Sequence, residues 1–317
     1  MAPQLAFMGL GNMGRGMCKN LVEKGNLDKP LILWNRTQKR ADDLAATLGT
    51  SGAKVASTIQ DAVKPADIIF ICVGDDKADR ETVDTITSVN VDGKLIVDCS
   101  TVHPDTTLEL ESTLAAKGAA FVAMPVFGAP AMADAGQLIC IMAGPKDALE
   151  RVTPYCKGVM ARAEIKFPDE PQSKAPLLKL IGNSMILQMV ESIAEGLTLA
   201  EKSGLGADHL HEWIGLMWPG AYPAYSQRMI KGDYYKRDEP LFAVDLARKD
   251  AGHVLKIADD SGAKVRAVEL VDHHLLMAKN YAGTKGDLAG MYGAVRQEAG
   301  LAYENDPEDK GKAKAES

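Results

Sequence analysis

A short apolar segment, Leu5–Met8, runs directly into a glycine turn near the start of this 317-residue chain, and this junction limits the possible folds more than any other feature. The turn has the spacing G-x-G-x-x-G. In a strand-turn-helix unit the first glycine permits the tight turn, the second lets backbone approach a pyrophosphate, and the third lets the helix pack closely on the strand. Glycine turns without a nucleotide have the same spacing, so the surrounding sequence has to support the interpretation. We predict a dinucleotide site formed by Gly9, Leu10, Gly11, Asn12, Met13 and Gly14.

The first half of the chain alternates short apolar runs with helical patterns. Near-continuous runs of Val, Ile and Leu between crossover helices are typical of parallel strands covered on both faces. We therefore predict a Rossmann-type, doubly wound parallel sheet over residues 1–168. Its expected strands are Leu5–Met8, Leu31–Trp34, Lys54–Ala56, Asp67–Val73, Leu95–Cys99, Phe121–Val126 and Leu138–Ala143.

The second half changes to helical periodicity. Apolar residues recur every three to four positions over 173–204, which predicts one long helix that links the sheet domain to an all-helical domain over 169–303. Glycine and proline turns separate further predicted helices, and the charged segment 304–317 is expected to be a disordered tail. The further helices are Ala207–Leu216, Leu241–Asp259, Ala267–Ala282 and Asp287–Tyr303.

Charge and cysteine content favour a protein that acts on small molecules. The formal net charge is −7 and no basic block is present, which argues against a nucleic-acid partner. The five cysteines are scattered and lack a C-x-x-C pair, so we expect reduced thiols and no metal site. Without a basic leader or a long apolar span, the expected location is cytoplasmic, with no membrane segment.

The residues after the second predicted strand indicate which dinucleotide is bound. NAD sites place an acid there for the ribose 2′-hydroxyl, whereas this chain has Asn35, Arg36 and Thr37, with Arg40 close behind. A guanidinium can pair with a 2′-phosphate, so we predict NADP; the alternative is a solvated basic start of a helix. At later strand ends, Val73 is expected to border the cofactor and Thr101 to bond a nicotinamide or ribose group.

Taken together, these motifs resemble those of the β-hydroxyacid dehydrogenase family, which includes 3-hydroxyisobutyrate dehydrogenases and glyoxylate and succinic semialdehyde reductases. The resemblance covers about residues 4 to 300. It implies a Rossmann domain followed by an all-helical domain. The family's motifs correspond to Gly9–Met17, Asn35–Thr37, Asp98–Thr101, Pro125–Ala129, the pair Lys179 and Asn183, and the series Phe242, Leu246, Lys249 and Asp250.

The resemblance also implies roles for three polar residues. Lys179 would be the general acid and base, Asn183 would orient the substrate oxygen, and Lys249 would reach toward the cofactor. Spacing is compatible with this, because residues four apart lie on one face of a helix. Spacing alone would more often describe an ordinary surface pair, so these assignments depend on the resemblance.

The chain departs from the family on the substrate side. Phe127 stands where the family has a serine, and Ala129 replaces the second of two glycines, with Gly128 between them. A phenylalanine offers no hydrogen bond to a carboxylate and adds apolar bulk. We still expect Phe127, Gly128, Ala129 and Thr101 to line the substrate pocket together with Lys179 and Asn183.

We therefore expect an NADP(H)-dependent oxidoreductase that moves a hydride between nicotinamide and a small carbonyl or alcohol, such as an aldehyde, a semialdehyde or a 3-hydroxyacid. An imine reductase of the same fold is an alternative, since Phe127 would suit a substrate without a carboxylate. A non-catalytic NADP-binding sensor or adaptor is a second alternative. The expected assembly is a homodimer or a higher homo-oligomer.

Overall fold

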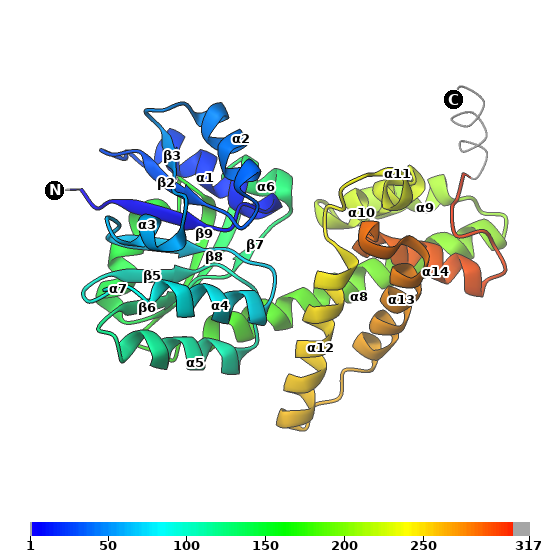
Figure 1. Cartoon of the computed structure of the whole chain (residues 1–317). Coiled ribbons are helices and arrows are strands. Elements are labelled where there is room, and N and C mark those ends of the chain that lie inside the picture. Colours follow the sequence, from blue (N-terminus) through cyan, green and yellow to red (C-terminus); the bar gives the residue numbers. More distant parts are fainter. Residues whose placement is uncertain (1, 307–317) are drawn as a thin grey trace. The chain divides into compact units, whose positions relative to one another are not determined.

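A computed structural model describes residues 2–306 of the chain, which form two compact units divided between Leu180 and Ile181 (Figure 1). The first unit contains the sheet and the first two turns of the long helix. Its strands are β1 (Leu5–Met8), β2 (Leu31–Trp34), β3 (Ala53–Val55), β4 (Ile68–Ile71), β5 (Leu95–Asp98), β6 (Ala120–Ala123), β7 (Val126–Phe127), β8 (Leu138–Gly144) and β9 (Ala161–Pro168). Its helices are α1 (Asn12–Lys24), α2 (Gln38–Leu48), α3 (Ile59–Val63), α4 (Asp76–Ile86), α5 (Pro104–Ala115), α6 (Pro130–Asp134) and α7 (Lys146–Val152), followed by the start of α8 (Lys174–Lys202).

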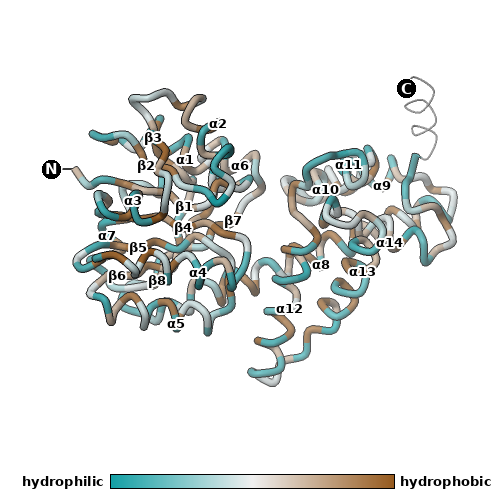
Figure 2. The backbone as a smooth tube through the Cα atoms, viewed as in Figure 1, coloured by the Kyte–Doolittle hydropathy of each residue, from teal (hydrophilic) through white to brown (hydrophobic). Residues whose placement is uncertain are grey.

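Six parallel strands in the order β3-β2-β1-β4-β5-β6 form the main part of the sheet. Side chains alternate between its faces: Leu5 and Phe7 pack with α1, whereas Ala6 and Met8 pack with α3, α4 and α5. Helices therefore cover both faces, and Figure 2 shows the apolar strands inside this more polar layer. This confirms the predicted doubly wound architecture.

Beyond β6 the sheet is mixed, which differs from the parallel strands expected there. The expected strand Phe121–Val126 is divided into β6 and β7, and β8 runs antiparallel to both. The segment 128–137 between β7 and β8 holds only the five-residue α6, which is shorter than the dozen or so residues that a parallel crossover requires. The sequence analysis also missed β9, because this edge strand leaves most of its side chains partly or fully exposed and lacks a buried apolar run.

The second unit is helical in its described residues. It contains the rest of α8, then α9 (Ala207–Met217), α10 (Ala221–Ile230), α11 (Asp233–Lys236), α12 (Val244–Ser261), α13 (Arg266–Ala282) and α14 (Met291–Glu298). The sequence analysis had assigned no element to the segments that form α10 and α11.

The last predicted helix, Asp287–Tyr303, is too long at both ends. Asp287 has extended backbone, and its carboxylate accepts bonds from the Leu241, Phe242 and Ala289 amides and from Arg228. At the other end, Gly300 has a φ of 74° and Tyr303 packs against other tyrosines. Of the predicted tail 304–317, residues 307–317 lie outside the described part. Glu304 accepts a hydrogen bond from Tyr281, and Asn305 donates one to the Ile230 carbonyl.

The long helix α8 spans 29 residues, close to the predicted 173–204. Among the described helices it alone is long and apolar enough to cross a membrane. Because 56% of its most apolar stretch is buried inside the protein, as in the core helix of a soluble protein, this property is weak evidence for a membrane segment.

Two glycines permit the closest approach in the sheet unit. A Cβ atom on Gly9, whose φ is 97°, would lie 2.2 Å from the Cys72 carbonyl oxygen at the end of β4. A Cβ atom on Gly14 would lie 2.1 Å from the Gly9 carbonyl oxygen. A Cβ atom on Gly11, between them, would meet nothing within 4 Å. The first and third glycines are therefore required by packing, and the second is not.

We predict that Gly14→Ala destabilises the protein and that Gly11→Ala does not. Helix propensity alone would favour alanine at position 14 by up to about 1 kcal/mol. The backbone clash should reverse that sign and cost at least about 1–3 kcal/mol. Urea unfolding followed by circular dichroism measures both variants, and equal free energies of unfolding for the two would contradict this packing role.

Candidate active site

A cleft of about 640 Å³ opens beside the glycine turn, at the carboxyl ends of β1, β2 and β4. Ligands of open α/β sheets bind at this edge, outside the strand ends. The first helical turn of α1 begins there as well, with backbone N–H groups that have no partner within the helix. The walls are formed by Gly9, Leu10, Gly11, Trp34, Asn35, Arg36, Thr37, Arg40, Ser57, Thr58, Ile59, Gln60, Cys72, Val73, Gly74, Asp75, Ala78, Glu81, Thr82 and Thr85.

Within the glycine turn, backbone is more accessible than side chains. The open space around Gly11 leaves its backbone free for close approach by a ligand. Met13 packs partly buried against the core, and Gly14 is buried. Asn12 does not line the cleft, because its side chain accepts a hydrogen bond from Arg15 at 2.7 Å and faces a second pocket. Any contact from Asn12 or Met13 to a ligand in the cleft would thus come from the backbone.

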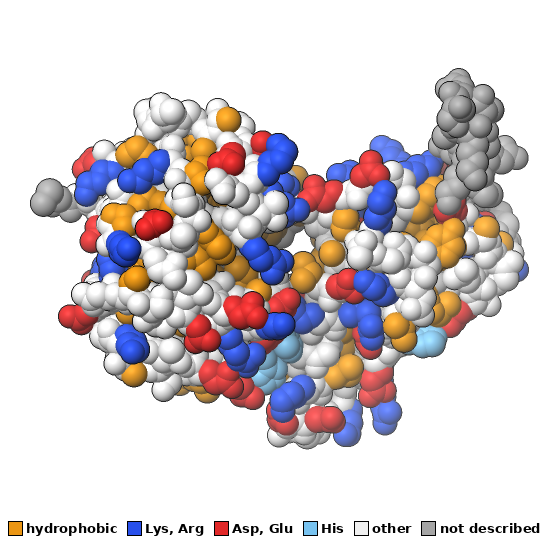
Figure 3. Space-filling model, viewed as in Figure 1, with side chains coloured by type: hydrophobic (Ala, Val, Ile, Leu, Met, Phe, Trp, Pro, Cys, Tyr) orange, Lys and Arg blue, Asp and Glu red, His pale blue; other side chains and the backbone are white. Residues whose placement is uncertain are grey.

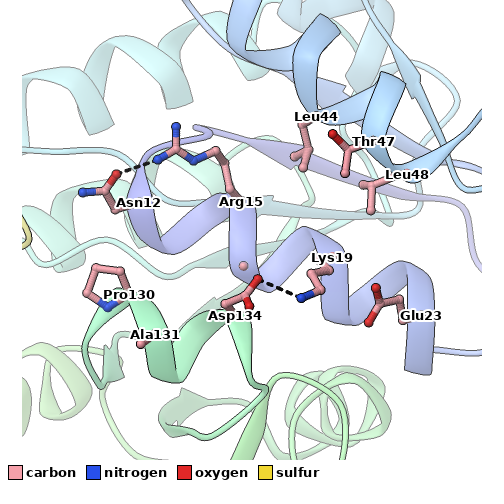
Figure 4. A pocket seen from close by; sticks show the side chains of 11 residues that line it. Asn12, Arg15, Lys19, Glu23, Leu44, Thr47, Leu48, Pro130, Ala131 and Asp134 are labelled. Atoms are coloured by element: carbon pink, nitrogen blue, oxygen red, sulfur yellow. Dashed lines mark hydrogen bonds and ion pairs between the residues drawn. The ribbon is translucent and has the colours of Figure 1, made fainter. Parts of the chain in front are cut away.

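The second pocket, of about 430 Å³, lies on the outer side of α1 (Figure 4). Leu44 and Leu48 of α2 border it on one side and Pro130 of α6 on the other. An ion pair between Lys19 and Asp134, 2.9 Å apart, joins α1 to α6 at its edge. It shares no lining residue with the strand-end cleft and is a separate pocket.

The segment after β2 carries the positive charge of the cleft. Asn35 holds it in place: its Oδ1 accepts from the Leu10 amide and its Nδ2 donates to the Thr37 carbonyl, both at 2.9 Å. Arg36 and Arg40 are exposed at the rim, and neither guanidinium has a hydrogen bond or ion pair within residues 2–306. Asn35 therefore stabilises the conformation of this segment, and the two arginine side chains remain available to a ligand.

The opposite wall comes from β4, α3 and α4. Val73 lines the cleft as predicted, and its amide donates to the Ser100 hydroxyl at 3.0 Å. Thr101 is half-buried just beyond β5 and is not part of this wall. Sequence reasoning missed the wall residues on α3 and α4. These helices follow β3 and β4, so the ends of these strands could have indicated the residues, as the end of β4 indicated Val73.

Lys179, in the second turn of α8, lies against Phe127 of β7. The lysine side chain is buried, and its Nζ lies 4.4 Å from the centroid of the phenyl ring, a cation-π contact. The structure therefore brings together the predicted acid-base residue and the residue at which the chain departs from the family.

Cys72 shows that Lys179 also lies near the cleft. Burial, together with the charges of Asp98 and Asp79, raises the pKa of this thiol to about 12, and the Lys179 ammonium acts in the opposite direction. Because Cys72 is part of the cleft wall, the Lys179 charge acts on a residue of that wall. The thiol itself remains protonated and unreactive at neutral pH.

The turn after Phe127 has little freedom. Gly128 has a φ of 144°, and a Cβ atom there would lie 2.6 Å from Leu138 of β8. Ala129 is exposed and precedes α6, whose first residue, Pro130, has no N–H group. These residues follow the phenyl ring but offer no side-chain donor.

The other predicted polar residues belong to the second unit. Asn183 donates to Asp250 Oδ2 at 2.7 Å, and Lys249 Nζ lies 3.2 Å from Asp250 Oδ1. Asp250 is buried and thus holds both side chains. Sequence reasoning quoted Asp250 within a motif without giving it a role; a charged residue predicted on the buried face of a helix was the available signal.

In residues 2–306 no group of three or more His, Cys, Asp or Glu side chains is arranged to hold a metal ion. On the face shown in Figure 3, acidic and basic side chains are intermixed over both units without a large patch of one sign.

Comparison with known proteins places this site in context. Residues 4–165 match the family model of the NAD-binding domain of 6-phosphogluconate dehydrogenase, and residues 174–295 match that of the NAD-binding domain of NADP-dependent 3-hydroxyisobutyrate dehydrogenase. A relative from Aspergillus ustus, the NADH-dependent oxidoreductase ucdB, is 35% identical over 92% of this chain and 98% of its own length. Glyoxylate/succinic semialdehyde reductase 1 of Arabidopsis thaliana is 27% identical over 92% and 98%.

Solved structures share the fold. A 3-hydroxyisobutyrate dehydrogenase from Salmonella typhimurium superposes with a TM-score of 0.80 at 22% identity, over 94% of this chain and all of that one. An imine reductase from a Pseudomonas species has a TM-score of 0.60 at 20% identity, over 93% and 99%. With two family models in sequence and a 35% identical relative over nearly its full length, the chain belongs to the β-hydroxyacid dehydrogenase family of NAD(P)-dependent oxidoreductases.

Proposed function

We propose that this protein is an NADP(H)-dependent reductase of small carbonyl compounds, or the corresponding alcohol dehydrogenase, in which Lys179 is the general acid and base. The observation that carries the proposal is the buried Lys179 ammonium, whose charge acts on Cys72 in the wall of the strand-end cleft. Few positions in a protein hold a lysine that is both buried and beside a nucleotide cleft, and such groups are typical of proton transfer.

The cleft fits a dinucleotide. The accessible Gly11 backbone and the start of α1 suit a pyrophosphate. Arg36, just after β2, and Arg40, in the first turn of α2, suit the 2′-phosphate of NADP. An acid at the end of β2, which would favour NAD, is absent. The Aspergillus relative is named NADH-dependent; the proposal of NADP for this chain depends on its own Arg36.

The bound coenzyme supplies or accepts the hydride. In reduction, the Lys179 ammonium donates its proton to the carbonyl oxygen as the carbon accepts the hydride, so that an alcohol forms. In oxidation, the neutral amine takes the alcohol proton. We assign Asn183, held by Asp250, to orienting the substrate oxygen, and Thr101, Gly128 and Ala129 to the pocket around it. Lys249, paired with Asp250, is assigned to the cofactor side.

Phe127 favours a second candidate reaction. An imine carbon is reduced by the same hydride transfer, and a pocket lined by a phenyl ring suits a substrate without a carboxylate. Parallel assays with aldehydes, oxoacids and cyclic imines separate carbonyl from imine reduction. A coenzyme that stays unreacted with every class would instead favour the non-catalytic sensor.

We also propose a homodimer. Helix α9 exposes apolar side chains that a monomer leaves in water, including Trp213, Leu216 and Met217, of which Leu216 is 81% exposed. Sedimentation at several concentrations measures the assembly.

We predict that Arg36→Ala weakens NADPH binding by about 10- to 100-fold, the equivalent of one or two charge-assisted hydrogen bonds, and leaves NADH binding unchanged. Lys39→Ala is the matched control, because Lys39 is also exposed, on α2, but is paired with Asp43 and does not line the cleft. Fluorescence titration measures the dissociation constants. Equal weakening of both coenzymes, or a wild type that prefers NADH, would contradict the assignment of Arg36.

We predict that Lys179→Met lowers turnover by about 10²- to 10⁴-fold, the range typical of a lost general acid, while the affinity for NADPH is retained. Methionine preserves an apolar stem against Phe127. Lys174→Met serves as the control on the same helix, since Lys174 is exposed and paired with Glu170. Steady-state turnover with NADPH and an aldehyde measures both, and wild-type activity in Lys179→Met would refute the proposed role.

A further inference from the structure

Phe127 does more than replace a hydrogen-bonding residue, because it directly contacts the buried ammonium of Lys179. A lysine side chain is long and flexible, and its charge is strongly hydrated in water. In this protein the ring face, which carries partial negative charge, lies 4.4 Å from Nζ and replaces part of that hydration. The contact thus limits where the ammonium can lie.

The ring itself is held firmly. Phe127 pairs with Ile139 in the sheet, and it packs with Val73 and Leu178 against the buried core. The next residue, Gly128, has no room for a side chain against Leu138. The sheet therefore carries the ring, and the ring in turn positions the long lysine side chain.

The segment around the ring offers an anion little. Phe127 and Ala129 have no side-chain donor, and Pro130 has no backbone N–H. A substrate carboxylate seated beside the ring would lose its hydration without gaining a partner from this segment, which is costly. An alkyl or aryl group seated there would gain an apolar contact.

We infer that Phe127 is a positioning and specificity-determining residue: its ring holds the Lys179 ammonium toward the reacting oxygen and selects carbonyl substrates with an apolar substituent over those with a carboxylate. This inference rests on the proposed function. The inference goes beyond the proposed function because it names the substrate class and the residue that selects this class.

The test compares pentanal with succinic semialdehyde, two aldehydes of similar length of which only the second has a carboxylate. The wild type should have the higher kcat/KM for pentanal. Phe127→Ser should shift the ratio of the two kcat/KM values toward succinic semialdehyde by about tenfold or more, since it removes the apolar wall and adds a hydroxyl.

Two conservative variants separate positioning from wall shape. Phe127→Leu keeps the apolar wall without a ring, so kcat for pentanal should fall by about tenfold with little change in the substrate ratio. Phe127→Tyr keeps the ring and should retain kcat. NADPH affinity equal to that of the wild type shows that each variant is folded, and these conservative changes test the inference even if the serine variant does not fold.

The outcomes are distinct. A wild type that prefers succinic semialdehyde, an unchanged ratio in Phe127→Ser, or full kcat in Phe127→Leu would overturn the inference and leave the proposed function standing. A wild type that reduces neither aldehyde nor any other carbonyl would overturn the proposed function, and the inference with it.

Discussion

The contact between Gly14, Gly9 and the Cys72 carbonyl is the constraint on which the rest of the site depends. No Cβ atom fits at either glycine, and only this closeness lets α1 begin directly over the ends of β1 and β4. The start of a helix, with N–H groups that have no partner within the helix, thereby borders a cleft at the strand ends. Gly11, which has space around it, is the position that the packing leaves to a ligand.

The charged side chains of the first unit's proposed site lie near the same edge of the sheet. Asn35 fastens the segment after β2 to the glycine turn, so Arg36 and Arg40 reach the rim of the cleft. The Lys179 charge lowers the pKa of Cys72, which is part of the cleft wall. Both the residues proposed to choose the coenzyme and the residue proposed to move the proton are therefore carried by the first unit. In the second unit, Asp250 holds both Asn183 and Lys249.

Much of the fold could be predicted from sequence, because β1, β2, β4, β5 and β6 are mostly buried and consist of apolar runs. The prediction failed where burial is partial or connections are short, as in the exposed edge strand β9 and the antiparallel β7 and β8. Residues of the cleft were predictable where a glycine turn or a strand end fixes the backbone. The role of Asp250 in holding Asn183 and Lys249 could not be predicted, because it depends on which buried side chains of different helices come into contact.

Phe127 illustrates what the sequence reveals about the site and what it does not. Sequence alone reveals that an apolar ring stands where a hydrogen-bonding residue is expected. It does not reveal that the ring contacts Lys179, since the two residues are 52 positions apart in the chain and only the fold brings them together. A substitution that looks like the loss of a substrate contact is, in the folded protein, also a contact to the residue proposed as the acid.

A crystal structure of the protein with NADPH tests the central claim most directly. We expect the pyrophosphate at the Gly11 backbone, the 2′-phosphate at the Arg36 guanidinium, and the nicotinamide at the inner end of the cleft, beside Cys72 and Lys179. A coenzyme bound with Arg36 turned away from it, or with its nicotinamide remote from Lys179, would contradict the account.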